Sequence, residues 1–209
     1  MNEEESFLKS IGELRKISTK RKFAQTVDMI INLKDFDVRR EAFSLFISVP
    51  NKVKDKKIAG FLEKKSKLIE SITKEEFASF KEKKDFKKLV RGYDFFIANA
   101  KLMPAIATTF GRSLGPAGKM PSPQLGILVS EDEKAIEDLV KKVDATVKVK
   151  VKEPSIKIAI GLESLTDEQI MRNALTVYHK IIDTLPRKKD NIRNVKIKFT
   201  MSKPILVEF

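Results

Sequence analysis

The strictest constraint on the fold is the alternation of apolar and polar residues in the stretch 145–161, ATVKVKVKEPSIKIAIG. Val147, Val149 and Val151 alternate with lysines, and isoleucines take the alternate positions after Pro154. Side chains of a β-strand point to its two faces in turn, so this period of two predicts strands with one buried face and excludes an amphipathic helix. Because proline lacks the N–H that a strand ladder uses, Pro154 predicts a break between two strands.

The same alternation recurs near both ends of the chain. In residues 23–33 five apolar side chains share one parity, and in residues 43–49 four do, before Pro50 stops the run. Residues 194–209 predict a strand, a break at Pro204 and a second short strand. The pattern permits an antiparallel sheet built from both chain ends, with the middle of the chain inserted, but does not require it.

Two amphipathic helices are predicted beside these strands. In residues 3–17 the apolar side chains recur at helical spacing. Thr166 and Gln169 form a capping box, in which each side chain accepts a hydrogen bond from the other's backbone N–H at a helix start. The apolar stripe that follows is Ile170, Ala174, Val177 and Ile181.

Beyond residue 50 the pattern changes to one of alternating strands and helices. Short apolar runs at residues 57–62, 93–100 and 126–130 are separated by charged stretches with the composition of helices. This order is typical of βα units around a parallel sheet, the doubly wound arrangement. The changes of pattern predict crossings between two modules near residues 51–53 and 154–156.

Charge identifies the class of partner. The 209 residues include 42 Lys and Arg against 29 Asp and Glu, a net charge of +13, which favours a polyanion such as RNA or DNA. Charge does not locate the site, because residues 53–154 carry 22 cations against 15 acids and the remainder 20 against 14. No apolar run approaches the ~20 residues of a membrane span, the N-terminus lacks a signal segment, and cysteine is absent, so we expect a cytoplasmic protein.

The glycine- and proline-rich stretch 112–123, RSLGPAGKMPSP, raises the question of a phosphate-binding loop. Such a loop requires a glycine five residues before its Gly-Lys pair and a hydroxyl residue after it. Here Ser113 takes the place of the first glycine and Met120 that of the hydroxyl residue. The stretch therefore predicts a rigid connection rather than a nucleotide site.

Candidates for catalysis are few. His179 is the single histidine and lies within the predicted capped helix, where a position on the helix surface is expected. No cluster of histidine and carboxylate residues has the spacing of metal ligands. The acidic run 131–133 is interpreted as a helix start and the basic run 81–88 as a solvated face. We expect no enzyme activity, no cofactor and no metal.

Binding chemistry is richer towards the chain ends. In residues 20–26, KRKFAQT, three cations precede Phe23, and residues 198–204, KFTMSKP, combine hydroxyls, Met201 and a proline break. Cations neutralise phosphates, while aromatic and apolar surfaces pack against ribose and base. The alternative that Phe23 simply begins a strand facing the core stays open at this point.

Taken together, GRSLGPAGKMPSP, KFAQTVDMIINL and TMSKP resemble the universal large-subunit ribosomal protein L-one family, and GKMP is similar to its archaeal branch. The resemblance runs in family order over essentially the whole chain. It implies an α+β first domain built from residues 1–52 and 155–209, and an inserted Rossmann-like, three-layer α/β domain of residues 53–154.

The resemblance also implies a function. The first domain would bind large-subunit ribosomal RNA at the base of a mobile stalk, which assists release of deacylated transfer RNA from the exit site. The protein would also repress translation by binding its own messenger RNA. It would be a monomer when free, located on cytoplasmic ribosomes, with no membrane partner.

Carried over onto matching positions, the family's RNA-binding residues are Lys22, Phe23, Thr26, Lys157, Thr200, Met201 and Ser202. Lys22 would contact a phosphate, and Thr200 would bond a ribose hydroxyl beneath Phe23 and Met201. Ser202 stands where the family often has glycine, which puts a close backbone approach there in doubt. Gly126 is followed by isoleucine where the family often has threonine, which puts the local turn in doubt.

Two other classes of function compete with this interpretation. A nucleotide-dependent enzyme would hold its ligand in the inserted α/β module, and would bind nucleoside triphosphates but no ribosomal RNA fragment. A basic membrane-surface protein would need an amphipathic helix with a lysine-rich polar face and a bulky apolar face, which the sequence lacks.

Overall fold

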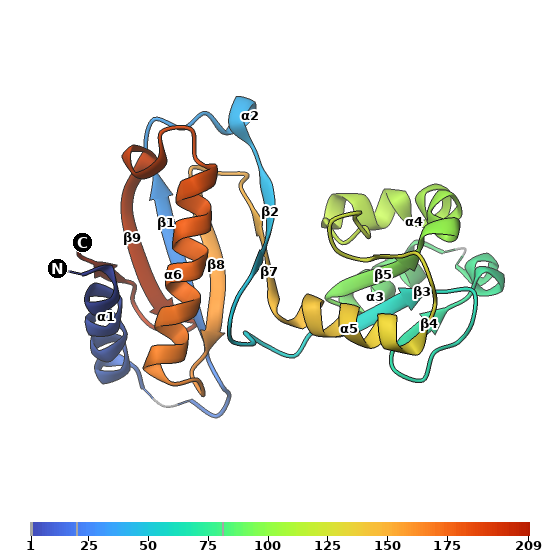
Figure 1. The fold of residues 1–209 in the computed structure, drawn as a ribbon, viewed down its shortest axis with the longest axis horizontal. Coiled ribbons are helices and arrows are strands. Elements are labelled where there is room, and N and C mark those ends of the chain that lie inside the picture. The colour runs from blue at the N-terminus through green and yellow to red at the C-terminus, as the bar shows by residue number, and fades with distance from the viewer. Residues whose placement is uncertain (1, 20, 81) are drawn as a thin grey trace. The chain divides into compact units, whose positions relative to one another are not determined.

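The computed structural model describes residues 2–19, 21–80 and 82–209 and divides the chain into two compact units (Figure 1). The end-built unit comprises Met1–Lys54 and Ala145–Phe209, and the inserted unit comprises Asp55–Asp144. The chain thus combines a mainly antiparallel part and a parallel part, a mixed α and β structure as predicted. Within the part of the chain described, no helix is long and apolar enough to cross a membrane.

An antiparallel sheet forms the centre of the end-built unit. Its order is β10 (Ile205–Val207), β9 (Ile192–Phe199), β1 (Thr26–Leu33) and β8 (Ser155–Leu162), and each neighbouring pair is antiparallel. The N-terminal strand β1 therefore lies between two strands from the C-terminal part of the chain, as Figure 1 shows. Both ends of the chain thus contribute strands to one sheet, an arrangement that the sequence pattern permits.

Helices α1 (Glu3–Ile17) and α6 (Asp167–Thr184) cover one face of this sheet (Figure 1). The odd-numbered residues of β1 are buried and the even-numbered ones half-buried, as the alternation predicts. Both helices were predicted, and the capping box of α6 is present: Gln169 N donates to Thr166 Oγ1 at 3.3 Å and Thr166 N to Gln169 Oε1 at 3.1 Å. One face of the sheet is thus left for solvent.

A two-stranded antiparallel ribbon, β2 (Ser44–Ser48) with β7 (Thr146–Lys150), completes the end-built unit. Its buried side chains join the core of the four-stranded sheet; they are Ile47, Val49, Val149 and Val151. The polar stretch before β2, expected to be a loop, contains the short helix α2 (Val38–Glu41), and a short 3-10 helix (Lys188–Asn191) precedes β9.

The compact units differ from the predicted domains, 1–52 with 155–209 and 53–154, mainly at the second crossing. The units meet at residues 144 and 145, because β7 pairs with β2 and Val49 N donates to Ala145 O at 2.7 Å. With the boundary at residue 144, the two units differ in net charge. The end-built unit now holds 24 of the 42 cations and 15 of the 29 acids, a net charge of +9, against +4 in the inserted unit.

The inserted unit contains a parallel sheet of order β4 (Glu70–Ile72), β3 (Ile58–Phe61), β5 (Phe95–Asn99) and β6 (Ile127–Leu128). Helices α3 (Lys83–Gly92) and α4 (Met103–Ala117) pack on one face and α5 (Glu133–Asp144) on the other. Two short 3-10 helices, Lys74–Ser79 and Ala100–Leu102, precede α3 and α4. Strand β4 was not predicted, because it has three residues and only Ile72 is buried.

The stretch 112–123 is not simply a connection, which corrects the prediction. Its first half forms the end of α4, which the buried residues Ile106, Phe110 and Leu114 anchor at a spacing of four. Gly118 ends the helix in the left-handed conformation, with φ 69°. Lys119 Nζ then donates to Val90 O and Tyr93 O, at 2.8 and 2.7 Å, so this lysine caps the C-terminal end of α3.

Candidate nucleic-acid interface

Residues from the two ends of the chain meet where β1 begins and β9 ends. Thr200 N donates to Thr26 O at 3.0 Å, and Thr26 N donates to Thr200 Oγ1 at 3.0 Å, across 174 positions of sequence. These two hydrogen bonds join the start of β1 to the end of β9. The hydroxyl of Thr200, predicted to bond a ribose hydroxyl, accepts the first N–H of β1 within the protein.

The turn after β9 presents Met201 to solvent, with 60% of its surface exposed. Ser202 closes this turn: its N–H donates to Phe199 O at 3.1 Å, and its Oγ accepts from Phe199 N at 2.9 Å. Among the residues described, only Asp35 and Lys188 adopt positive φ without being glycine. The backbone at Ser202 therefore does not need glycine, and the serine hydroxyl holds the turn.

Phe23 lies outside β1, which begins at Thr26, and 53% of its surface is exposed. The alternative that it begins a strand facing the core is wrong. Lys22 beside it is also exposed. Ile17, at the end of α1, is 62% exposed, so two neighbouring segments each present a large apolar side chain to solvent.

Gln25 joins the segments that carry these side chains. It is 1% exposed, and its Nε2 donates to Ser18 Oγ at 3.2 Å and to Glu163 Oε2 at 3.3 Å. Its Oε1 accepts from Met201 N at 3.3 Å. One buried amide thus holds the end of α1, the turn after β8 and the turn after β9 in a single arrangement.

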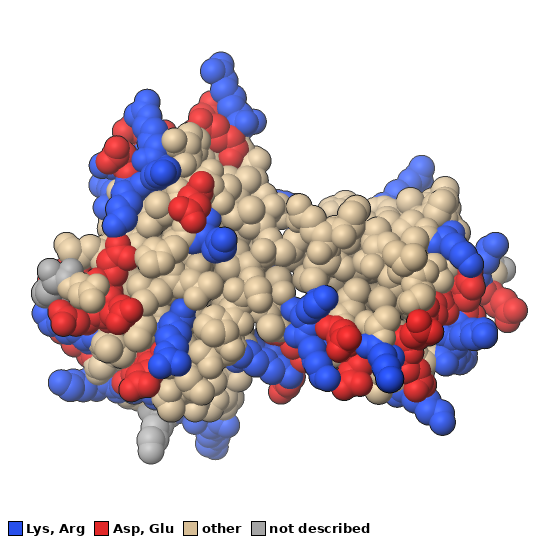
Figure 2. Space-filling model, viewed as in Figure 1, with Lys and Arg blue, Asp and Glu red and all other residues tan. Residues whose placement is uncertain are grey.

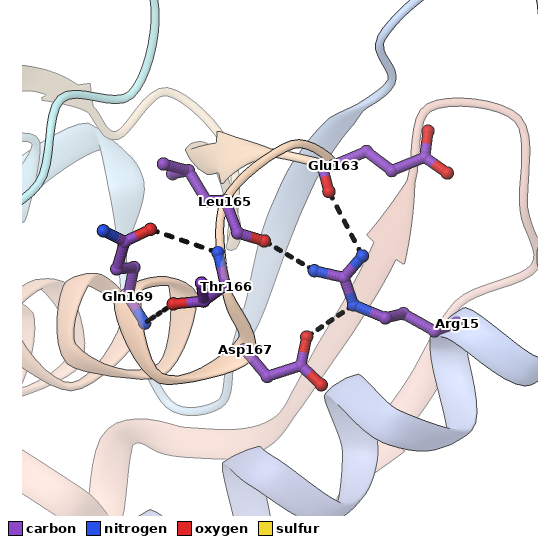
Figure 3. A network of polar contacts seen from close by, with 6 residues as sticks. All are labelled: Arg15, Glu163, Leu165, Thr166, Asp167 and Gln169. Carbon is purple, nitrogen blue, oxygen red and sulfur yellow. Dashed lines mark hydrogen bonds and ion pairs between the residues drawn. The ribbon is translucent and has the colours of Figure 1, made fainter.

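Arg15 reinforces the same junction from α1 (Figure 3). Its guanidinium donates to Asp167 Oδ1 at 2.5 Å, to Leu165 O at 2.6 Å and to Glu163 O at 3.1 Å. Figure 3 shows the Glu163 carboxylate directed away from Arg15, and that carboxylate accepts from Gln25. The turn before α6 is therefore fixed from both sides.

Sequence reasoning missed Arg15, Gln25 and Glu163 as parts of this site. A buried polar contact between distant segments has no period that a pattern search can detect. One signal was present, because Gln25 has the parity of the apolar positions in residues 23–33. A polar side chain at a core position requires buried hydrogen-bond partners.

Lys157 lies on β8, away from this junction but on the open face of the same sheet. It is opposite Ile30 of β1, which is also opposite Lys196 of β9, so two lysines flank one isoleucine. Ile30 lies four residue steps along β1 from Thr26, a distance of about 13 Å. Lys157 pairs with Glu153 at 3.5 Å. The predicted residues thus form a cluster at the junction plus a separate basic position.

The charges of the open face are mixed. Asp28 lies opposite Lys198, and burial raises the pKa of Asp28 while the charge of Lys198 opposes that shift. Figure 2 shows one side of the molecule, on which cations and acids are interspersed rather than gathered in one patch. The interface is therefore defined by particular side chains and not by a broad field of one sign.

His179 lies on the surface of α6, as predicted, and its Nε2 is 2.8 Å from Glu3 Oε2. Hydrogen bonds from Lys189 and His179 hold the pKa of Glu3 below its ordinary value. This contact fastens α1 to α6. Among the described residues no group of three or more His, Cys, Asp or Glu is arranged to hold a metal ion.

The carboxyl ends of β3 and β5, where doubly wound sheets bind phosphates, are occupied by a side chain of the protein itself. The Glu131 carboxylate accepts from Glu63 N at 2.7 Å, Lys64 N at 3.1 Å and Asn99 Nδ2 at 2.6 Å. Helix α5 begins only at Glu133, so the first acid of the run 131–133 does not start a helix. A nucleotide phosphate would have to displace this carboxylate.

Comparison with known proteins gives consistent matches. Residues 14–203 match the model of the ribosomal protein L1p/L10e family. The large ribosomal subunit protein uL1 of Pyrococcus horikoshii is 35% identical over 98% of this chain and 96% of its own length. Its counterparts from Thermococcus kodakarensis and Nanoarchaeum equitans are 35% and 34% identical, over 98% and 95% of this chain and 97% and 99% of their own lengths.

Proposed function

The chain belongs to the ribosomal protein L1p/L10e family, with archaeal relatives, and from that premise we propose that its end-built unit recognises ribosomal RNA. Family membership makes it a protein of the large ribosomal subunit, associated there with ribosomal RNA on cytoplasmic ribosomes. The family is one of structural ribosomal proteins rather than enzymes. The proposed interface comprises residues 21–26, the turn 199–202 and the open sheet face around Lys157.

One observation carries the proposal: Phe23 and Met201 are exposed, and hydrogen bonds of the buried Gln25 join the segments that carry them. Exposed apolar side chains on a fixed backbone can stack on unpaired bases without first being ordered. Lys22 supplies a phosphate contact beside them. Thr200 serves the interface by joining β1 to the turn after β9, and its exposed position leaves the second lone pair of its hydroxyl available to RNA.

The RNA target is the structured site at the base of the mobile stalk near the transfer-RNA exit site. The same surface binds a similar structure in the protein's own messenger RNA and thereby represses its translation. The free protein is a monomer. These statements rest on the family resemblance of the motifs around Phe23 and Thr200.

The nucleotide-dependent enzyme is the weaker candidate. The stretch around Gly118 and Lys119 departs from a phosphate-binding loop, and Lys119 is committed to capping α3. Glu131 occupies the position where a phosphate would bind in this type of sheet. Both features oppose nucleotide binding by the inserted unit.

Phe23→Ala tests the proposed interface. The side chain is half-exposed, so its loss should change the free energy of unfolding by less than about 0.5 kcal/mol. A base stacked on an aromatic ring contributes about 1–3 kcal/mol, so affinity for a stalk-base RNA fragment should fall roughly five- to 150-fold. Affinity for unrelated duplex RNA should not change, and binding of both RNAs is measured by filter retention.

Leu68→Ala is the matched control, because Leu68 is 52% exposed and lies in the inserted unit. It should bind the fragment as the parent does. Equal affinities of the Phe23→Ala variant, the control and the parent would show that the interface lies elsewhere. A parent that binds the fragment no better than unrelated duplex RNA would refute the function itself.

A further inference from the structure

Helix α3 of the inserted unit carries a row of four cations along one face. Lys84, Lys87, Lys88 and Arg91 follow the spacing i, i+3, i+4 and i+7, which places them on one side of a helix over about 10 Å. All four are exposed. Together with Gly92 they line an open hollow of about 520 Å³. We call these four residues the α3 basic face.

The cations of the α3 basic face are not held in ion pairs. None of its four cations forms an ion pair with any residue that the structure describes. Other exposed lysines of the inserted unit do form such pairs, for example Lys65 with Glu76 at 2.8 Å and Lys141 with Glu137 at 2.7 Å. The positive charge of α3 is therefore available to an external anion.

The helix is held firmly behind this face. Leu89 is buried, and Phe86 and Val90 pack against the same core, with the Phe86 ring 5.5 Å from that of Phe110 in α4. At the C-terminal end, the ammonium of Lys119 caps the carbonyl of Val90. The glycine- and proline-rich stretch thus fixes one end of the helix that presents the cations.

We propose that the α3 basic face is a second RNA-docking surface, which contacts the phosphate backbone of double-helical RNA without reading its sequence. A row of cations about 10 Å long can meet several phosphates, each of which displaces a counterion when it is neutralised. This contact is independent of which RNA the end-built unit recognises.

Two other partners fit the face less well. A protein interface usually has an apolar or aromatic centre, whereas the exposed large apolar side chains of the inserted unit, Leu68 and Val129, are not on α3. The expectation that the chain lacks an amphipathic helix with a lysine-rich polar face is wrong, because α3 is such a helix. A membrane-surface helix inserts its apolar face into lipid, however, and the apolar face of α3 is packed in the core. The phosphate backbone of a nucleic acid is therefore the partner that fits the α3 basic face best.

The test uses the full-length protein with Lys84, Lys87, Lys88 and Arg91 all changed to Gln. Glutamine has nearly the helix propensity of lysine and arginine, so α3 should stay folded, as far-UV circular dichroism and thermal unfolding will show. The probe is an RNA duplex of about 16 base pairs and arbitrary sequence. Losing four phosphate contacts should reduce the magnitude of the slope of log binding constant against log salt concentration by roughly 3.

The matched control changes four exposed lysines of the inserted unit outside α3 to Gln, and so removes the same charge. They are Lys67, Lys74, Lys101 and Lys134. The control should flatten the salt dependence by less than about 1. Equal slopes in the two variants would overturn the proposal, because general basicity would then account for the binding.

A second measurement locates the contact directly. The chain contains no cysteine, so Lys87→Cys provides a single attachment point for a photo-crosslinker, with Lys134→Cys as its control. Crosslinking of the duplex from position 87 and not from position 134 is expected. If the α3 variant keeps its RNA salt dependence but loses binding to poly-glutamate, the face binds an acidic protein and the proposal is overturned.

Discussion

Replacing Gln25 by Met should separate the positioning of the interface from its direct contacts with RNA. Gln25 is buried and cannot touch RNA, but it makes three side-chain hydrogen bonds of 3.2–3.3 Å, to Ser18, Glu163 and Met201. Methionine has a similar length and none of the hydrogen-bonding groups. The variant therefore removes the side-chain hydrogen bonds to three segments while it fills nearly the same volume, and the backbone bond from Glu163 N to Gln25 O at 2.8 Å remains.

The expected loss of stability follows from those three bonds. Each contributes about 0.5–1.5 kcal/mol net, so the free energy of unfolding should fall by roughly 2–4 kcal/mol. For a chain of this size that corresponds to a decrease in Tm of about 5–12 °C. Released segments would carry Phe23 and Met201 in several orientations, so affinity for the stalk-base fragment should fall about tenfold, the equivalent of 1.4 kcal/mol.

Ile181→Ala controls for general destabilisation. Ile181 is fully buried in α6, about 21 Å along the helix from Asp167 and the interface, and its truncation should cost about 2–5 kcal/mol. Thermal unfolding and RNA binding are measured for both variants, with binding well below either Tm. The reasoning is refuted if both variants bind the fragment equally, or if Gln25→Met is as stable as the parent.

Two further predictions concern the inserted unit. Burial alone would raise the pKa of Glu131, but hydrogen bonds from Glu63 N, Asn99 and Lys64 N outweigh it and hold that pKa below its ordinary value. The ionised Glu131 carboxylate therefore stabilises the fold above the unfolded pKa of about 4.3, and this stabilisation is lost as pH falls through the folded pKa. Glu131→Gln should lower the free energy of unfolding by on the order of 1 kcal/mol at neutral pH and by little in acid. Urea unfolding of variant and parent at pH 7 and pH 3 checks this, and a difference in stability that is the same at both pH values contradicts it. Excision of Asp55–Asp144, with a short glycine linker in its place, should leave a folded remnant that binds the fragment. The reason is that the described core of the end-built unit contains no side chain of the inserted unit. An unfolded remnant at every linker length tried would count against two separable domains.

Local periodicity was enough to predict the main elements of the end-built unit. Helix α1 and its buried residues, the alternation of β1 and the capping box of α6 all follow from positions a few residues apart. Exposure of a side chain at every second or every third to fourth position depends only on strand and helix geometry. The same reasoning identified the change to a parallel α/β arrangement.

The sequence determined these elements, the excess of cations and, through its motifs, the family. Only the tertiary structure decided that β1 lies between β8 and β9 and that α4 continues into a stretch rich in glycine and proline. The tertiary structure decided as well that β7 pairs with β2, which places the unit boundary at residue 144. It also decided that Gln25 joins three segments and that Lys119 caps α3. These contacts join residues between 26 and 176 positions apart, and such contacts depend on which surfaces meet when the chain packs, a choice that no local pattern encodes.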